Sequence, residues 1–479
     1  MRQEDKKTFQ SPLIDRYASE EMAYLFSAEN KFRTWRKLWV ALAEGQRELG
    51  LPISEVQIDE LKQFQDKIDY EEVARLEKET RHDVMAHIGA FGQLCPKAKP
   101  IIHLGATSAY VVDNTDLILI KEGLRLILQR LVNVLKALRD FAYDQRNVAI
   151  LGFTHLQPAQ PTTLGKRATL WLYDLITDLH DLEFRLEHLA FLGVKGTTGT
   201  QESFLKLFQN DQAKVVKLDG LVSQKFGFNR TFPVTGQIYS RKVDYQILSL
   251  LSGLAQSAHK FSNDLRILQH LKEVEEPFET TQVGSSAMAY KRNPMRCERM
   301  AALARYVICL SPNAAFTAAG QFLERTLDDS ANRRLTIPEA FLATEAILKI
   351  YHNVASGLVV NKEIINYHLQ QEVPFLATEE LLMEAVRAGG DRQELHERIR
   401  KHAMEAAAQV KRGGRNDLFN RLGADPLFTS VKDKFDAFLS ADHYIGRAPQ
   451  QVEEFLKNEV ETLLIRYGYL LGLEAQLEV

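Results

Sequence analysis

The strongest constraint on the fold is one long apolar stripe in residues 113–147. Apolar side chains recur there at alternating spacings of three and four, which is the pattern of a single helical face. The stripe comprises Leu117, Ile120, Leu124, Ile127, Leu131, Val134, Leu138 and Phe141. About thirty residues at a rise of ~1.5 Å each make a rod of roughly 45 Å. Such a rod cannot bury its apolar face alone, so the stripe predicts packing against other long helices.

Several later stretches of the chain carry the same helical pattern. Further helices are expected over residues 168–189, 240–273, 294–309 and 338–360. Gly193 would end the first of these and Pro277 would bound the second. The last two would begin at Pro294 and Pro338, where the N–H that proline lacks has no helical partner to lose. Together with the first rod these helices predict a bundle.

The first rod carries details of its own. Asp113 and Asn114 are suited to cap its start. It also has more apolar positions than one stripe needs, namely Leu119, Leu126, Leu128 and Leu135. Self-association through the rods is the expected outlet for these positions.

The regions on either side of the bundle indicate shorter helices. Prolines interrupt the first 110 residues, glycine pairs interrupt the region after residue 361, and no alternating strand pattern stands out. We therefore predict an all-α fold of three domains. The predicted domains are an N-terminal helical domain (1–111), a central long-helix bundle (112–363) and a C-terminal helical domain (364–479).

Composition narrows the classes of function. The 479 residues include 60 basic and 63 acidic side chains, so there is no overall positive charge to attract nucleic acid. No run of eighteen apolar residues occurs, which argues against a membrane role. The three cysteines are odd in number and widely spaced, which is typical of free thiols. A cytoplasmic protein is the expectation.

Several kinds of catalytic site lack their motif. His82 and His87 are five residues apart, which does not fit a helical zinc pair, and neither HExxH nor paired CxxC occurs. Phosphate-binding glycine loops are missing too, and neither Ser285 nor Ser286 lies in GxSxG. Cys297 would need a histidine partner that the sequence cannot place, so a buried thiol is the better interpretation. No metal and no cofactor are predicted.

The segment GSSAMAYKRNP, residues 284–294, is the best candidate for a reactive loop. A serine follows a glycine there, cationic side chains come a few residues later, and a helix is expected to start at Pro294. Cations and unpaired N–H groups of the loop and of the helix start would hold a carboxylate and favour charge that develops on it. From the residues alone, a solvated loop with a capping serine is an equally good interpretation.

The segments taken together resemble one superfamily. GSSAMAYKRNP is similar to the signature loop of the fumarase/aspartase superfamily, THLQPAQ (154–160) to its histidine segment, and IHLGATSAYVVDNTD (101–115) to its first substrate segment. The order of the segments matches as well. RYAS, KFRTWRKLW, RHDVMAH and FLERTLDDSANRR narrow the resemblance to the adenylosuccinate lyase family, of the type found in animals. This resemblance implies a fumarase/aspartase-like fold and spans nearly the whole chain.

The resemblance assigns roles in the elimination of fumarate. Ser285 would be the general base and His155 the general acid, the two coming from different subunits. Lys291 would bind the carboxylate on which charge accumulates, and His82 would orient the substrate. Glu298 would support His155 or Lys291. General acid catalysis contributes about 10² to 10⁴-fold, so loss of His155 should cripple turnover.

The resemblance also assigns substrate-binding residues. The carboxylate would be bound with help from Asn293, Thr107, Ser108 and Thr154. The phosphate contacts would be Arg16, Tyr17, Arg325, Ser330 and Arg334. Without the resemblance, surface ion pairs with Asp328 and Asp329 would be the preferred interpretation of these arginines. Gln237 would contact the succinyl portion, and the remaining substrate contacts would be Arg81, Asp83 and Arg299.

The implied reaction is the cleavage of adenylosuccinate to AMP and fumarate, and of the succinylaminoimidazole carboxamide ribotide of purine biosynthesis. The implied assembly is a homotetramer. Two alternatives remain open at this stage, namely another superfamily member such as argininosuccinate lyase, and a non-catalytic helical scaffold. One residue departs from the family, because Ala289 stands where the signature has proline. Proline would stiffen the loop, so we expect Ala289→Pro to raise affinity or rate modestly.

Overall fold

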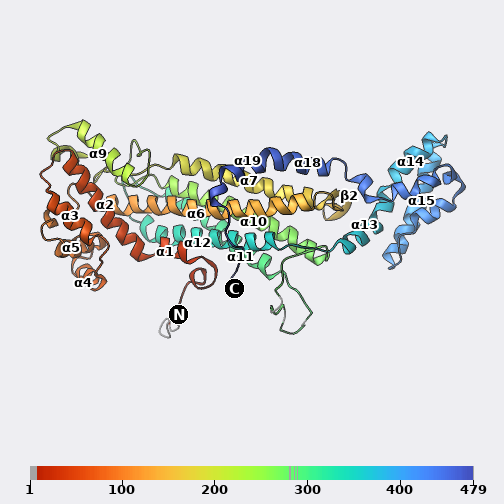
Figure 1. The fold of residues 1–479 in the computed structure, drawn as a ribbon, viewed down its shortest axis with the longest axis horizontal. Coiled ribbons are helices and arrows are strands. Elements are labelled where there is room, and N and C mark those ends of the chain that lie inside the picture. The colour runs from red at the N-terminus through yellow and green to blue at the C-terminus, as the bar shows by residue number, and fades with distance from the viewer. Residues whose placement is uncertain (1–7, 280–281, 285, 289, 478–479) are drawn as a thin grey trace.

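The computed structural model is an elongated molecule built around long helices that run along its length (Figure 1). It describes residues 8–279, 282–284, 286–288 and 290–477. Shorter helices gather at both ends of the rod. Helices of the N-terminal region lie at one end. Helices between residues 362 and 438 lie at the other.

The central bundle consists of five long helices. They are α6 (Ser108–Asp144), α7 (Leu164–His188), α10 (Lys242–His270), α11 (Met295–Ala319) and α12 (Asp329–Ser356). Helix α6 packs on α7 and α12, and α10 packs on α7, α11 and α12. The predicted bundle and the mainly helical fold class are confirmed.

The apolar stripe of α6 faces the core as predicted, and all of its residues are buried. The additional apolar residues are mostly buried as well, because Leu119, Leu128 and Leu135 pack inside the same chain and Leu126 packs against the core. These four residues therefore do not supply the surface for self-association that their number suggested.

The start of α6 differs from the prediction. The helix begins at Ser108, and Thr107 occupies the N-cap position. Asp113 and Asn114 are buried inside the helix, so neither caps it. The Asn114 side chain instead accepts a bond from the Gly193 N–H at 3.0 Å and donates to the Gly193 carbonyl at 3.1 Å. Asn114 thereby fixes the chain that follows α7.

The ends of the other bundle helices deviate to different degrees. Helix α7 ends at His188, before Gly193, and α11 continues to Ala319. Helix α12 begins at Asp329 and carries Pro338 in its interior, so the start predicted at Pro338 is wrong.

A hairpin that the sequence did not predict joins α6 to α7. Strand β1 (Ala149–Thr154) pairs antiparallel with β2 (Gln157–Thr163), with an irregularity between Leu151 and Gly152. A second pair of two-residue strands, β3 (Val274–Glu275) and β4 (Val359–Val360), ties the end of α10 to the end of α12.

The N-terminal end of the rod consists of short and medium helices. These are the π-helical turn η2 (Leu13–Tyr17), α1 (Glu20–Leu25), α2 (Ala28–Glu48), α3 (Glu55–Phe64), α4 (Tyr70–Thr80) and α5 (Asp83–Leu94). Helices α8 (Glu202–Leu207) and α9 (Gln212–Lys225) belong to the connection between α7 and α10, and α9 packs on α2.

The C-terminal region has a core of its own. Buried residues between Ala377 and Phe438 form a cluster separate from the main core. The helices in and around it are α13 (Lys362–Leu376), α14 (Thr378–Arg387), α15 (Arg392–Lys411), α16 (Leu418–Ala424) and α17 (Phe435–Phe438). The chain then returns along the bundle as α18 (Ala448–Phe455) and α19 (Glu461–Arg466) (Figure 1). The division into domains at residues 111 and 363 stays a prediction.

Two features of the described residues concern membrane insertion and metal binding. No helix within them has both the length and the apolar character needed to cross a bilayer. No group of three or more potential ligands among them is arranged to hold a metal ion.

Candidate active site

The predicted site residues form three separate groups in a single chain. The first lies where α5, α6 and α12 meet, the second along the start of α11, and the third at the tip of the β1–β2 hairpin. The hairpin lies beside α13, at the end of the long-helix bundle remote from α4 and α5 (Figure 1).

The first group is centred on His82, which occupies the N-cap of α5. Its Nδ1 accepts a long bond from the Met85 N–H at 3.4 Å, and its Nε2 lies 3.4 Å from Ser108 Oγ. Nδ1 also lies 3.5 Å from Asp83 Oδ1, and the tautomer of the ring decides which atom of the Nε2–Ser108 pair donates. Asp83 adds a contact to α12, since its Oδ2 lies 3.3 Å from Arg334 Nη2. The structure thus brings together residues that are about 250 positions apart in the chain.

A cavity of about 280 Å³ opens beside this group, between α2, α6 and α12. Predicted phosphate contacts Ser330 and Arg334 line it together with Lys31, Asp116 and Arg333. Burial lowers the pKa of Lys31, while the nearby Asp116 carboxylate works in the opposite direction. Lys31, Asp116 and Arg333 were not predicted as site residues, although Lys31 and Arg333 lie in KFRTWRKLW and FLERTLDDSANRR.

The second group follows the candidate loop. Lys291, Asn293 and Glu298 line an open pocket against α10. Asn293 Nδ2 donates to the Gly284 carbonyl at 2.9 Å, which ties the two limbs of the loop together. A Cβ on Gly284 would lie 2.1 Å from the Lys291 carbonyl oxygen, so only glycine fits this closure.

The start of α11 is already occupied by a carboxylate of the chain itself. Glu276 is buried, and its two carboxylate oxygens accept the backbone N–H groups of Arg296 and Cys297 at 3.0 and 2.9 Å. The Met295 and Glu298 N–H groups donate to backbone carbonyls. The prediction that free N–H groups at this helix start bind a substrate carboxylate is therefore wrong. The binding of a substrate carboxylate by Lys291 and Asn293 stays a prediction.

The third group is the hairpin tip. His155 and Leu156 form a two-residue turn, and both have left-handed backbones, with φ of 54° and 57°. Turns of this kind favour asparagine and glycine, so neither residue suits the conformation intrinsically. His155 and Thr154 are exposed, and Leu156 is 70% exposed. The turn presents the imidazole away from its own chain.

The remaining predicted binding residues surround the bundle at several points. Arg299 lies with its guanidinium 5.5 Å from the Tyr17 ring centroid, and the neighbouring Arg16 is exposed. Gln237 donates from its side chain to the Thr197 carbonyl at 3.1 Å and from its backbone to the Glu324 carbonyl. Arg81 is exposed in a left-handed conformation at the end of α4.

Arg325 forms an ion pair with Asp329, as the alternative interpretation expected, but the carboxylate is buried and does not lie at the surface. Its Nη1 lies 3.6 Å from Asp329 Oδ2, and the Asp329 side chain is fully buried. Two residues of the candidate loop, the predicted base Ser285 and the unusual Ala289, lie outside the described residues.

Comparisons with known proteins identify the family. A family profile described as "Lyase" matches residues 18–309, and one described as "Adenylosuccinate lyase C-terminus" matches residues 374–455. The chain is 49% identical over 466 residues to an adenylosuccinate lyase of Schizosaccharomyces pombe, with 96% of each chain covered. It is 46% identical to that of Schistosoma mansoni, covering 98% of this chain and 99% of the other. The chain belongs to the adenylosuccinate lyase family.

Membership in the adenylosuccinate lyase family makes the chain a lyase of the fumarate-eliminating kind. Solved structures agree on the fold. A 3-carboxy-cis,cis-muconate lactonizing enzyme of Pseudomonas putida superposes with a TM-score of 0.82 at 21% identity, covering 95% of this chain and all of the other. A fumarate lyase of Mesorhizobium sp. BNC1 gives a TM-score of 0.79 at 22% identity, covering 92% and 99%. The chain shares its fold with these structural neighbours. Its higher sequence identity to adenylosuccinate lyases separates it from them.

Proposed function

We propose that the chain cleaves adenylosuccinate to AMP and fumarate, and that it cleaves the succinylaminoimidazole carboxamide ribotide in the same way. The single observation that carries the proposal is the resemblance to adenylosuccinate lyases over almost the entire chain, at up to 49% identity. The arrangement of His82, Ser108, Asp83 and Arg334 in one cluster supports it. The same observations favour this reaction over that of argininosuccinate lyase and over a non-catalytic scaffold.

The proposed mechanism uses side chains and no cofactor. Ser285 removes the proton from the succinyl carbon beside a carboxylate, and the two electrons of that C–H bond move into the carboxylate. Lys291 and Asn293 stabilise the dianionic intermediate by charge and hydrogen bonding. The intermediate then expels the purine nitrogen, which takes a proton from His155 as the C–N bond breaks. His82 and Ser108 orient the substrate.

The test of this function is the appearance of fumarate, followed spectrophotometrically with adenylosuccinate as substrate. We expect turnover by the unmodified protein and a loss of about 10² to 10⁴-fold in kcat for His155→Ala. Ser285→Ala should also abolish most of the activity, and circular dichroism should show that both variants remain folded. The proposal fails if the folded, unmodified chain releases no fumarate. Arg325→Ala should weaken nucleotide substrates, which would separate this reaction from that of argininosuccinate lyase.

We further propose a cytoplasmic homotetramer whose active sites combine residues of several subunits. The support is that the hairpin with His155 lies at the end of the long-helix bundle remote from α5, whose N-cap is His82 (Figure 1). One chain cannot bring both to the same substrate. A mixture of His82→Ala and His155→Ala subunits, dissociated and reassembled together, should therefore regain activity that neither variant has alone. Activity that stays absent in verified mixed tetramers would contradict shared sites.

The division into domains is proposed on the same basis. The N-terminal domain (1–111) carries His82, the central bundle (112–363) carries His155 and the α11 start, and the C-terminal domain (364–479) has a separate apolar core. The proposed partners are the nucleotide substrates and other copies of the chain.

A further inference from the structure

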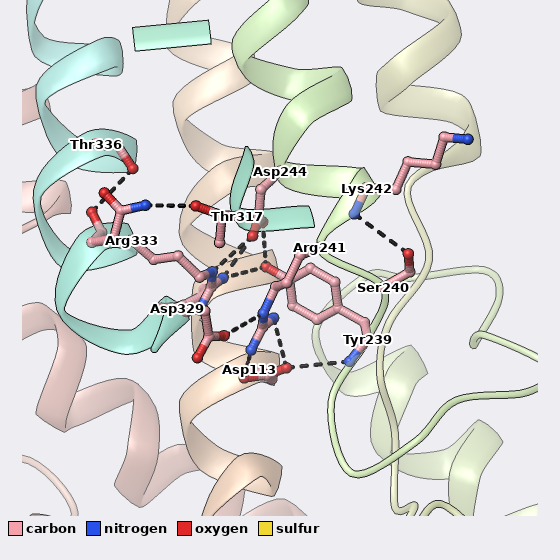
Figure 2. A network of polar contacts seen from close by, with 12 residues as sticks. Asp113, Tyr239, Ser240, Arg241, Lys242, Asp244, Thr317, Asp329, Arg333 and Thr336 are labelled. Atoms are coloured by element: carbon pink, nitrogen blue, oxygen red, sulfur yellow. Dashed lines mark hydrogen bonds and ion pairs between the residues drawn. The ribbon is translucent and has the colours of Figure 1, made fainter. Parts of the chain in front are cut away.

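Arginines and aspartates at the starts of α6, α10 and α12 form a cluster (Figure 2), which is buried except for the partly exposed Asp116. Asp113 and Asp116 come from α6, Asp244 from α10, and Asp329 and Arg333 from α12, while Arg241 occupies the N-cap of α10. We call these six residues the aspartate–arginine cluster. It joins the start of α6, the start of α10 and the start of α12.

Each of the two arginines of the cluster binds two of its four carboxylates. Arg333 lies 2.8 Å from Asp116 and 2.7 Å from Asp244. Arg241 binds Asp113 through both terminal nitrogens, at 2.9 and 3.1 Å, and donates from Nε to Asp329 Oδ2 at 2.6 Å. Arg241 is only 2% exposed, so water does not compete for these bonds. Within the described residues, Asp329 accepts no side-chain hydrogen bond other than this one from Arg241.

A third arginine forms a loose ion pair with the same carboxylate but no hydrogen bond. Arg325 Nη1 lies 3.6 Å from Asp329 Oδ2, too far for a hydrogen bond. This Nη1 is buried and has no hydrogen-bond partner in the described part of the chain, and the same holds for Asp329 Oδ1. A rotation of either side chain would convert the loose pair into a direct one. Arg241 competes with that change because it already neutralises Asp329.

We propose that Arg241 is a positioning residue for nucleotide binding, which occupies Asp329 and so keeps Arg325 available for the phosphate of the substrate. The inference rests on the proposed function, in which Arg325 contacts that phosphate. Without Arg241, Asp329 would be a buried carboxylate with Arg325 as its one nearby cation. Arg325 would then move to hydrogen-bond with Asp329. Phosphate binding would then have to break a buried ion pair.

The cluster also connects Arg241 to other site segments. The Tyr239 N–H donates to Asp113 at 3.3 Å, and the Tyr239 hydroxyl donates to Asp244 at 2.7 Å. A purely structural role of Arg241 therefore predicts broad damage to the site. The positioning role predicts a loss that affects the phosphate and that depends on both Asp329 and Arg325.

The experiment measures the dissociation constant of AMP by calorimetry, together with kcat and KM, for four variants of the full-length protein. The loss of AMP affinity in Arg325→Ala measures how much Arg325 contributes to binding the phosphate. Arg241→Gln should weaken AMP binding on the order of tenfold to a hundredfold, the range of a charged hydrogen bond, with a smaller effect on kcat. Arg241→Gln combined with Asp329→Asn should recover most of the affinity. Arg241→Gln combined with Arg325→Ala should bind AMP no more weakly than Arg325→Ala alone.

Further measurements keep the inference falsifiable. Arg241→Lys retains a buried charge but cannot bind Asp113 and Asp329 together, so it should fold even if Arg241→Gln does not, and should weaken AMP binding. The inference is overturned if folded Arg241 variants bind AMP like the unmodified protein. It is equally overturned if Arg241→Gln and Arg325→Ala weaken binding additively, or if Asp329→Asn restores nothing. Failure of the unmodified protein to bind AMP would instead contradict the proposed function.

Discussion

Asp178 offers a quantitative test of how burial in the bundle controls stability. This aspartate lies on α7, is 8% exposed, and accepts a hydrogen bond from Ser257 Oγ at 2.6 Å on α10. Burial, with smaller contributions from Asp174 and Asp181, raises the pKa of Asp178 to about 7, although the Ser257 bond works against the rise. Asp178→Asn keeps the shape and an acceptor for Ser257, and it removes the ionisation.

The size and sign of the effect follow from the pKa. The folded state holds the proton more tightly than the unfolded state, in which the carboxyl has its ordinary pKa of 3.8. The contribution of Asp178 to stability is therefore fully present below pH ~3.8 and is lost as pH rises through about 7. The complete loss is about 4 kcal/mol, and about 2 kcal/mol of it has occurred by pH 5. Asp178→Asn should remove this loss.

The assay is urea unfolding at several pH values between 4 and 8, at one fixed protein concentration because assembly contributes to stability. The variant should match the unmodified protein near pH 4 and exceed it by up to about 4 kcal/mol at pH 8. Asp181→Asn, an exposed carboxylate on the same helix, should stay within about 0.5 kcal/mol throughout. A difference for Asp178→Asn that does not change with pH would refute the reasoning.

Three further changes test other parts of the molecule. His87→Phe should stabilise the protein by about 2 kcal/mol at pH 5 and by little at pH 8. Burial lowers the pKa of His87 to about 4, so the unfolded state gains a proton at pH 5 that the folded state does not, and the unmodified protein loses stability there. Gly152→Ala places a Cβ 2.4 Å from the Gln160 carbonyl, so it should distort the hairpin that carries His155 and lower kcat by about tenfold or more in the fumarate assay. Glu276→Gln should cost about 1 to 3 kcal/mol in urea unfolding and raise KM, because one N–H at the start of α11 loses its acceptor.

Each of these changes has a control or a contrary outcome. An equal effect of His87→Phe at pH 5 and pH 8 would contradict the role of protonation. Gly220→Ala is the control for Gly152→Ala, because nothing lies within 4 Å of the added Cβ, and it should leave kcat unchanged. Unchanged stability of Glu276→Gln would show that the α11 start does not depend on the carboxylate.

The interior of the bundle was predictable because apolar spacing reports directly on the buried face of a helix. The stripe from Leu117 to Phe141 is buried throughout. Helix starts were less predictable, because polar residues near a start have competing uses. Asp113 resembles a cap in sequence, yet in the structure it binds Arg241, which is 128 positions away. Pro338 resembles a start, yet packing of α12 on α6 and α10 extends the helix upstream of it.

The resemblance predicts His82, His155 and Lys291 as site residues, and these roles stay predictions. Nothing in the sequence showed that Glu276 fills the start of α11. The β1–β2 hairpin was missed because prolines interrupt its second strand and no alternation marks it. The two strands of such a hairpin are stabilised by pairing with each other and by packing on the helices beside them. Local sequence patterns do not record these contacts.

The separate apolar core between Ala377 and Phe438 has a consequence for how the molecule responds to heat and denaturant. A region whose buried side chains contact one another, apart from the main core, can open as one cooperative unit while the long helices stay folded. Amide hydrogens of α14 to α16 should then exchange with solvent together and earlier than those of α6 and α10. This region would thus set the lowest threshold for proteolytic attack, independently of the cluster around His82 at the other end.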